Sequence, residues 1–262
     1  MQVSPERFLA AQRVFSRAEL LEGLEVGRRR TLAAAEAALG TWLRSGRVRA
    51  VKRGVFVRAD LRLDRHDLWA LGCRMARDAV LAYHSALEIH GSAASLYEDV
   101  VFVTQTKVKP LQIDGRRMVP VRPSRMLEGR AERWVVRIDR GPYELRVTSL
   151  ERTVADALDR PDLAGGYDEA WRSCQAVPAL DPDELVAYVE TLGRRVLAAK
   201  VGHLLESRAE ELLVPETTLR RLEGLRPERP VYAVRGAPGR LEGRWNLLVP
   251  RSLGRAGTEM PE

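Results

Sequence analysis

Cysteine and long apolar runs are both scarce in this 262-residue chain. The two cysteines, Cys73 and Cys174, are too few for a disulfide scaffold and do not have the spacing of a zinc site. The sequence contains no run of eighteen apolar residues and no charged-then-apolar leader, so it predicts neither a membrane span nor a signal peptide. We therefore expect a cytoplasmic protein with one large or two ordinary domains, in which both cysteines are inert core thiols.

Lysine is almost missing as well. It occurs only at positions 52, 107, 109 and 200, so arginine carries nearly all of the positive charge. Arginine suits bidentate contacts with phosphate and guanine, but a G+C-rich genome produces the same preference, and we give it no functional weight. The distribution of charge is more informative. Residues 1–60 hold twelve Lys and Arg against six Asp and Glu, whereas the other 202 residues hold 31 against 30. The basic excess indicates a nucleic-acid-binding module in the first sixty residues.

The most basic part of that module runs from Arg28 to Arg58, with nine Lys and Arg against one acid, Glu36. Its pattern predicts a helix over about 28–44, a Ser-Gly exit, and two short strands around a Lys-Arg-Gly turn. This order is typical of the second half of a winged helix-turn-helix. A solvated charged face is the alternative interpretation.

Two regions of this segment are predicted to contact DNA. The first turn of the helix exposes amide groups and favours phosphate through the helix dipole, and the hairpin forms a wing that grips phosphate or enters the minor groove. The predicted DNA-binding residues are Arg28, Arg29, Arg30 and Thr31 at the helix start, and Arg47, Arg49, Lys52 and Arg53 in the wing. The outer face of the helix is rich in alanine and cannot donate to base edges, which is unusual for a recognition helix.

Helical signals define the rest of residues 1–60. Residues 4–12 predict a short first helix, and Ser16 with Glu19 forms a capping box at the start of the second, supported by a hydrophobic staple between Phe15 and Leu20. The third helix carries an apolar stripe, which we interpret as core packing rather than base stacking; its members are Leu32, Ala35, Leu39, Trp42 and Leu43.

Residues 61–250 predict a larger mixed α/β domain, which makes the whole chain α+β. Residues 64–91 are predicted to be helical, with a second capping box at Ser85 and Glu88 and a stop at Gly91. Four short strands follow, at Val100–Thr106, Met118–Val121, Trp134–Ile138 and Tyr143–Val147. Further helices are predicted after a cap at Thr148 and Glu151, at 167–177, after Asp181-Pro182 and over 194–213, with closing strands at Val231–Arg235 and Arg244–Val249. Residues 251–262 are predicted to be a flexible tail.

Three places in the sequence offer candidate catalytic or phosphate-binding groups. Glu98 and Asp99 at the head of a strand, with Lys107 on the same segment, allow a metal-dependent nuclease as an alternative, but the Glu-x-Lys pair that would hold lysine near an attacking water is missing. His84 and His90 are six residues apart on a predicted helix and so do not share a face. Gly165-Gly166 lacks the spacing of a phosphate-binding loop. We assign no catalytic, cofactor-binding or metal-binding residue.

A second, weaker basic set lies between residues 194 and 221, at Arg194, Arg195, Arg220 and Arg221. Intervening glutamates favour ordinary ion-paired helix faces, and an extension of the nucleic-acid contact is the alternative.

Three stretches in the expected order over almost the whole chain carry a family resemblance. They are FSRAEL with the basic hairpin VKRGVFV, then AYHSALEIHG, and then RVTSLERTVADAL with RWNLLVP. With these stretches the chain resembles the AbiEi-type antitoxins of type IV toxin–antitoxin systems. The resemblance implies a DNA-binding N-terminal domain that represses its own operon through inverted repeats, and a C-terminal domain that counters a nucleotidyltransferase toxin without a stable complex. The alanine-rich helix face departs from this pattern, and DNA shape then becomes a route to recognition.

The sequence thus predicts a winged helix over 1–60, an antitoxin domain over 61–250 and a tail over 251–262. The expected partners are the protein's own operator DNA and, functionally, a cognate toxin; no membrane contact and no cofactor is expected. Two alternatives stay open at this point: the nuclease, and a transcription regulator whose C-terminal domain senses a ligand.

Overall fold

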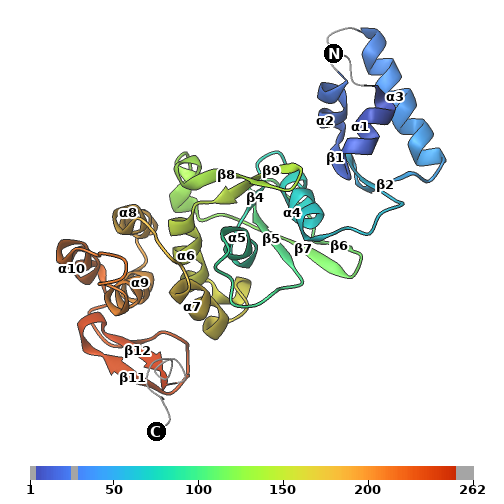
Figure 1. The fold of residues 1–262 in the computed structure, drawn as a ribbon. Coiled ribbons are helices and arrows are strands. Elements are labelled where there is room, and N and C mark those ends of the chain that lie inside the picture. Colours follow the sequence, from blue (N-terminus) through green and yellow to red (C-terminus); the bar gives the residue numbers. More distant parts are fainter. Residues whose placement is uncertain (1–3, 25–28, 252–262) are drawn as a thin grey trace. The chain divides into compact units, whose positions relative to one another are not determined.

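The computed structural model describes residues 4–24 and 29–251, and within these ranges the chain is a mixed α/β protein with three separate sheets (Figure 1). The predicted tail therefore lies outside the described residues, apart from Arg251. The chain divides into two compact units that alternate along the sequence. Unit 1 combines Met1–Leu81, Glu98–Arg122 and Arg137–Val147, and unit 2 combines Ala82–Tyr97, Pro123–Val136 and Thr148–Glu262. The predicted boundary at residue 60 lies within unit 1.

The first part of unit 1 contains three helices and a three-stranded antiparallel sheet. In chain order these elements are α1 (Pro5–Ala11), β1 (Val14–Ser16), α2 (Arg17–Gly23), α3 (Arg29–Arg44), β2 (Val48–Lys52) and β3 (Val55–Arg58), with the strands in the order β1-β3-β2. The predicted capping box is confirmed, because Ser16 Oγ accepts from the amide of Glu19 at 3.1 Å and Glu19 Oε2 accepts from the amide of Ser16 at 2.7 Å. Strand β1 was not predicted, since three residues are too few to show a period.

The apolar stripe of α3 is confirmed only at its centre. Ala35, Leu39 and Trp42 are buried, whereas Leu32 and Leu43 are 43% and 39% exposed. The prediction was wrong at these two leucines because helical spacing defines a wide face, while the core contacts only the middle of it.

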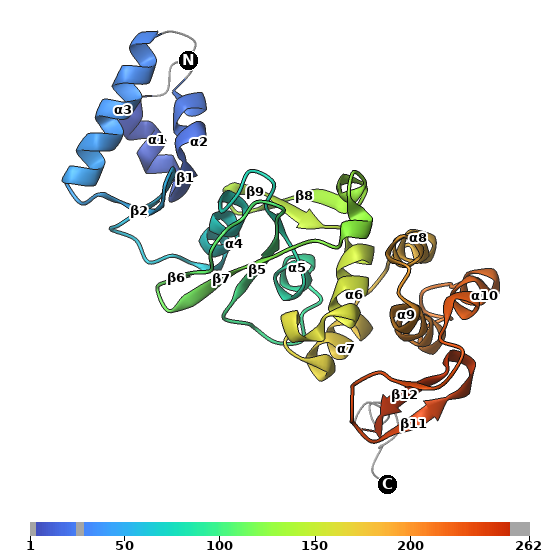
Figure 2. The same cartoon turned by 180° about the vertical axis from the view of Figure 1, so that it is seen from behind.

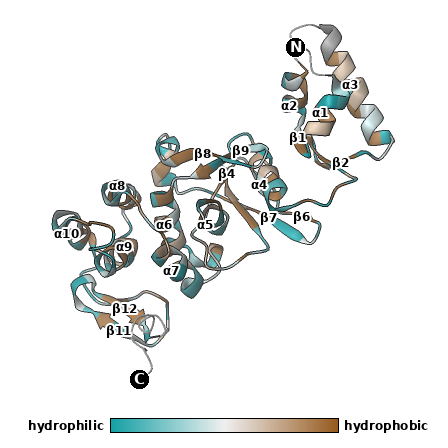
Figure 3. Ribbon diagram, viewed as in Figure 1, coloured by the Kyte–Doolittle hydropathy of each residue, from teal (hydrophilic) through white to brown (hydrophobic). Residues whose placement is uncertain are grey.

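The larger part of unit 1 is a six-stranded mixed sheet in the order β6-β7-β5-β4-β9-β8. Its elements, with the helix α4 that precedes them, are α4 (Arg65–Arg74), β4 (Val80–Leu81), β5 (Val100–Val103), β6 (Leu111–Ile113), β7 (Arg116–Val121), β8 (Val135–Arg140) and β9 (Tyr143–Thr148). Strand β5 pairs parallel with β7 and antiparallel with β4, and all four of its residues are buried. Figure 3 shows β5 as hydrophobic and the turn end of the β6–β7 hairpin as hydrophilic.

The prediction that residues 64–91 are helical was wrong at residues 80–81. These two residues form β4, a central strand, and helix α5 (His84–His90) begins three residues later. A central strand is apolar on both faces and therefore cannot be distinguished from a buried helical turn by its pattern. The capping box at Ser85 and Glu88 is also wrong, because Tyr83 occupies the N-cap without a side-chain bond and Glu88 accepts instead from the amide of Tyr97 at 3.0 Å. The stop at Gly91, which is left-handed at φ 77°, is confirmed.

Unit 2 is mainly helical and includes a small sheet in the order β10-β12-β11. Besides α5, its elements are α6 (Leu150–Asp159), α7 (Tyr167–Gln175), α8 (Pro182–Leu192), α9 (Arg195–Ser207), α10 (Glu216–Leu225), β10 (Val231–Tyr232), β11 (Gly239–Glu242) and β12 (Leu247–Pro250). Short 3-10 turns lie at Arg125–Leu127, Ala131–Trp134, Pro161–Leu163 and Gly243–Trp245. In Figures 1 and 2 helix α6 lies beside both α5 and α7, with which it makes many contacts.

Two helix starts in unit 2 test the cap predictions. The predicted start at Asp181 is confirmed, since Asp181 Oδ1 accepts from the amides of Asp183 and Glu184 at 2.9 and 3.1 Å. The N-cap of α6 is Ser149, one residue after the predicted Thr148, and Ser149 Oγ accepts from the amide of Arg152 at 3.3 Å. Helix α10 and strand β11 were not predicted.

Both cysteines are free thiols. Burial raises the pKa of Cys73 to about 11 and the pKa of Cys174 to about 12. Thiolate is the reactive form of cysteine, so the predicted inert character of both residues agrees with these shifts. Within residues 4–24 and 29–251, no helix combines the length and apolar character needed to cross a bilayer.

Glycine 202 shows how tightly unit 2 is packed. A Cβ atom added to Gly202 in α9 would overlap the indole ring of Trp245, whereas a Cβ added to Gly224 in α10 would meet no atom within 4 Å. We expect Gly202→Ala to lower the free energy of unfolding by about 1–3 kcal/mol through overpacking. We expect Gly224→Ala, the matched control, to raise it by about 0.4–1 kcal/mol. Urea unfolding followed by tryptophan fluorescence measures both, and equal midpoints for the two variants would contradict this packing.

Candidate nucleic-acid interface

The three-helix part of unit 1 is built on an aromatic core. Phe15 stacks edge-on against Phe8 at 5.3 Å and against Trp42 at 6.4 Å, and its ring lies 5.7 Å from that of Phe56. Trp42 is 1% exposed, and its indole nitrogen donates to Glu6 Oε1 at 3.3 Å. The interpretation of Trp42 as a core residue is therefore confirmed. This core fixes α3 and the β2–β3 hairpin to the same small body.

The turn between β2 and β3 is shaped by Gly54, whose φ of 79° lies in the left-handed region that favours glycine. The carbonyl of Gly54 accepts from the amide of Arg17 at 2.8 Å, which holds the turn beside the start of α2. Arg53 is exposed in this turn and has no hydrogen bond or ion pair with any residue in the described part of the chain. Of the predicted wing residues, Arg53 thus keeps its charge available.

The other three predicted wing residues have partners within unit 1. Arg47 binds both carboxylate oxygens of Glu6 at 3.1 and 2.7 Å. Arg49 binds Asp114, in the turn between β6 and β7, at 2.9 and 2.8 Å. Lys52 Nζ donates to the carbonyl of Met75 at 2.5 Å. Neither acid lies in the basic segment 28–58, so counting charges there could not find them.

These two ion pairs are exposed. The side chains of Arg47 and Glu6 are 49% and 65% exposed, and those of Arg49 and Asp114 are 41% and 44% exposed. The hydrogen bond from Arg47 lowers the pKa of Glu6, and the same bond raises the pKa of Arg47. Exposed ion pairs are weak, because water screens the attraction between the two charges. A phosphate group can therefore replace either carboxylate at small cost.

The DNA-binding residues predicted at the start of α3 fall at the edge of the described part of the chain. Arg28 lies outside the described residues, and Arg29, Arg30 and Thr31 open the helix with side chains that the structure does not describe. Further along the outward face, Glu36 binds Arg17 at 2.6 Å, and the hydroxyl of Thr41 donates to the carbonyl of Ala37 at 2.9 Å. The middle of this face thus offers mainly methyl groups, as the sequence indicated.

Glu98 and Asp99, the two carboxylates that a nuclease site would use, each form an ion pair with an arginine. Glu98 pairs with Arg116 at 3.0 Å, and Asp99 accepts from Arg117 Nε at 2.9 Å. Lys107 is exposed in the segment that follows β5. Among the residues that the structure describes, no three His, Cys, Asp or Glu side chains are grouped as metal ligands would be.

The stretch Ala82–Gly91 forms a buried polar cluster in unit 2. His84 is fully buried, with Nδ1 3.2 Å from Glu88 Oε1 and Nε2 3.4 Å from Glu169 Oε1, and its ring lies 4.8 Å from that of Tyr97. Burial alone would raise the pKa of Glu169, but bonds donated by the amide and hydroxyl groups around it outweigh burial and lower that pKa. The i, i+4 spacing of His84 and Glu88 was visible in the sequence, whereas Glu169 was not predictable.

The stretch Ser149–Leu158 contributes a second buried cluster. Arg152 is 1% exposed and binds Asp156 at 3.2 Å, and Asp156 also accepts from the hydroxyl of Tyr188 at 2.6 Å. His90 Nε2 lies 2.8 Å from the carbonyl of Thr148, which joins the end of α5 to the start of α6. These residues connect helices of unit 2.

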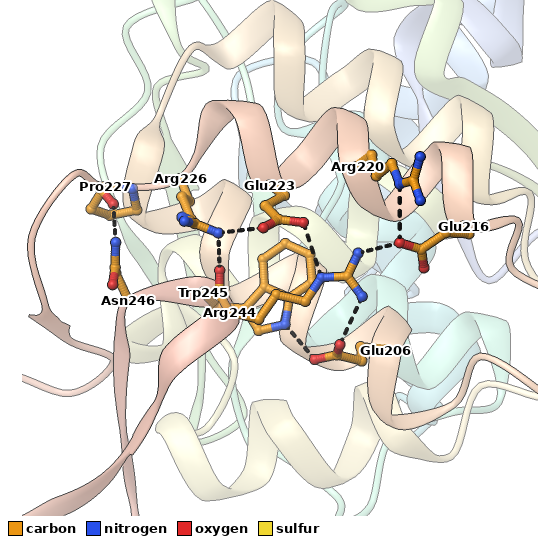
Figure 4. Close-up of polar contacts among 9 residues, drawn as sticks. All are labelled: Glu206, Glu216, Arg220, Glu223, Arg226, Pro227, Arg244, Trp245 and Asn246. Carbon is orange, nitrogen blue, oxygen red and sulfur yellow. Dashed lines mark hydrogen bonds and ion pairs between the residues drawn. The ribbon is translucent and has the colours of Figure 1, made fainter.

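The stretch RWNLLVP begins at a charged junction (Figure 4). Arg244 binds Glu206 at 2.9 Å, Glu216 at 2.8 Å and Glu223 at 3.1 Å, and the indole nitrogen of Trp245 donates to Glu206 at 2.6 Å. The bond from Arg244 lowers the pKa of Glu216. Burial alone would lower the pKa of Arg244, but the bonds to Glu216 and Glu206 raise it. One guanidinium thus joins α9, α10 and the turn before β12.

The second basic set is paired in the way the sequence favoured. Arg194 pairs with Asp159, Arg195 with Glu228 at 2.9 Å, Arg220 with Glu216 at 3.3 Å, and Arg221 with Glu190 at 2.9 Å and with Asp183 at 3.2 Å. These contacts agree with ion-paired helix faces.

We expect Arg244→Ala to lower the free energy of unfolding at pH 7 by about 1–2 kcal/mol, because three carboxylates lose a shared donor. The depressed pKa of Glu216 sets the pH dependence: the contribution is fully present above the ordinary value of 4.5 and is lost as pH falls through the lower pKa of the folded state. The difference between wild type and variant should therefore shrink below pH 4.5. Arg221→Ala, which removes exposed pairs, serves as the control and should change stability by less than about 0.5 kcal/mol. Urea unfolding at several pH values measures both, and a pH-independent difference would contradict the assignment.

Comparison with known proteins gives a likeness of fold. No family model and no curated protein matches this chain. Among solved structures, the chain is similar to the one described as the crystal structure of RV2827C protein from Mycobacterium tuberculosis, with a TM-score of 0.57 and 15% sequence identity. The similarity covers 93% of this chain and 90% of that chain.

Proposed function

We propose that this protein is a cytoplasmic DNA-binding antitoxin that represses its own operon, with residues 1–60 acting as a winged helix-turn-helix. The element order α1-β1-α2-α3-β2-β3 supports this proposal, because it is the order of helices and strands in a winged helix. The net positive charge of these residues supports it as well, since they include twelve Lys and Arg but only six Asp and Glu.

The observation that carries the proposal is the exposed β2–β3 turn. Arg53 projects from a turn fixed to the start of α2. Arg47 directly precedes the adjoining strand β2 and Arg49 lies on it, and both are in exposed ion pairs whose carboxylates phosphate can replace. In this proposal the wing and the first turn of α3 grip phosphates, and the alanine-rich middle of α3 leaves sequence preference to the helix start and to DNA shape.

The antitoxin part of the proposal rests on the resemblance to AbiEi-type antitoxins. Two of the three stretches that carry it supply polar side chains that link elements within unit 2: His84 and Arg152, which are buried, and Arg244, which is partly buried. The proposed role of that part of the chain is to counter a nucleotidyltransferase toxin without a stable complex.

We expect the protein to bind duplex DNA from upstream of its own gene more tightly than a scrambled duplex, with affinity that falls steeply with salt. Arg53→Ala should reduce the slope of log K against log salt by about one, because one phosphate contact is lost. Arg229→Ala removes an exposed arginine in unit 2 and should leave the slope unchanged. Fluorescence anisotropy from 50 to 200 mM salt measures all three proteins, and weak, equal binding of the wild type to both duplexes would refute autorepression.

We expect a nucleotidyltransferase toxin to be encoded beside this protein, and co-expression of this protein to restore growth to cells that produce that toxin. Arg53→Ala should rescue as well as the wild type when both are expressed from a foreign promoter, because antitoxicity is assigned to the C-terminal part. Colony counts measure the rescue, and failure of the wild-type protein at equal expression would contradict the antitoxin role.

A further inference from the structure

Three of the four lysines lie in unit 1, and two of them share one loop. Lys107 and Lys109 are exposed in the segment Thr104–Pro110 between β5 and β6, here called the lysine loop. Neither has a hydrogen bond or ion pair with any residue in the ranges 4–24 and 29–251. In contrast, Lys200 in unit 2 is 6% exposed and donates to the carbonyl of Leu158 at 2.9 Å.

The lysine loop is held in place by one carboxylate. Asp78 accepts from the hydroxyl of Thr104 at 2.6 Å, from the hydroxyl of Thr106 at 2.8 Å and from the amide of Gln105 at 2.7 Å. The amide of Thr106 also donates to the hydroxyl of Thr104 at 3.0 Å. Burial alone would raise the pKa of Asp78, but these bonds outweigh it and lower that pKa. The two lysines therefore extend from a fixed turn, which reduces the entropy lost when they bind a ligand.

The same short turn that carries Asp78 also anchors the proposed wing. Lys52 Nζ donates to the carbonyl of Met75 at 2.5 Å, and Met75 precedes Asp78 by three residues. Three residues span at most about 11 Å of chain. Arg77, between these two anchors, is exposed. A second link, the pair between Arg49 and Asp114, joins β2 to the β6–β7 turn.

These contacts place the wing and the lysine loop on one continuous part of unit 1. Its exposed cations include Arg53, Arg77, Lys107 and Lys109. Lysines act as point charges that suit the phosphate backbone and carry little sequence information. Asp78 accepts hydrogen bonds from the loop itself and so does not neutralise the lysines in a direct pair.

We propose that the lysine loop is a second phosphate-binding element, which extends the DNA contact beyond residues 1–60. This inference rests on the proposed function, because it assumes that the wing faces duplex DNA. Lys107 and Lys109 then add affinity without adding sequence preference.

The test compares the wild type with Lys107→Ala/Lys109→Ala and with a control, Arg229→Ala/Arg235→Ala, that removes the same charge from exposed positions in unit 2. The probes are the upstream duplex and a scrambled duplex of equal length, titrated by fluorescence anisotropy from 50 to 200 mM salt. Two lost phosphate contacts should reduce the salt slope by about two. Over this range the wild type should then lose about tenfold more affinity than the lysine variant. The lysine variant should weaken on both duplexes by the same factor.

The outcomes separate this inference from the proposed function. Salt-dependent wild-type binding with an unchanged slope in the lysine variant would overturn the role of the loop and leave autorepression standing. An equal change in the arginine control would also overturn it, because net charge would then explain the effect. If the wild type shows no salt-dependent binding to either duplex, both proposals fall together.

Discussion

Ion pairing between arginine and carboxylate decides which positive charges of this chain are available to a partner. Arg47 binds Glu6, Arg49 binds Asp114 and Arg244 binds three glutamates. Each such pair lowers the number of positive charges available to a partner below the number counted in the sequence. What remains on the described surface of unit 1 is a smaller set of cations, of which Arg53 projects from the β2–β3 turn. The basic character of residues 1–60 is therefore concentrated at a few points.

The strength of these pairs differs with burial. Arg47 and Arg49 are about half exposed, so their carboxylate partners can be exchanged for phosphate with little loss. Arg152 is buried with Asp156, and removal of either partner would leave a charge without compensation. The same residue type thus serves as an exchangeable surface contact in unit 1 and as a fixed internal link in unit 2.

Three polar side chains of unit 2 also form structural junctions. His84 lies between Glu88 and Glu169, Arg152 joins Asp156 beside Tyr188, and Arg244 connects α9 with α10. Buried polar networks require every member to be satisfied, which restricts the residues that can replace them.

The sequence by itself determined the local elements whose signals come from residues only a few positions apart in the chain. The capping box of Ser16 and Glu19, the start at Asp181 and the Lys-Arg-Gly turn could all be predicted, because their hydrogen bonds and backbone angles involve residues a few positions apart. The burial of Trp42 followed from helical spacing in the same way. Only the tertiary structure decided that residues 80–81 form a central strand, that Leu32 is exposed, and that Glu6, Asp114 and Met75 bind the predicted wing. These contacts join residues far apart in sequence, and a local pattern carries no information about which distant group will meet a given side chain.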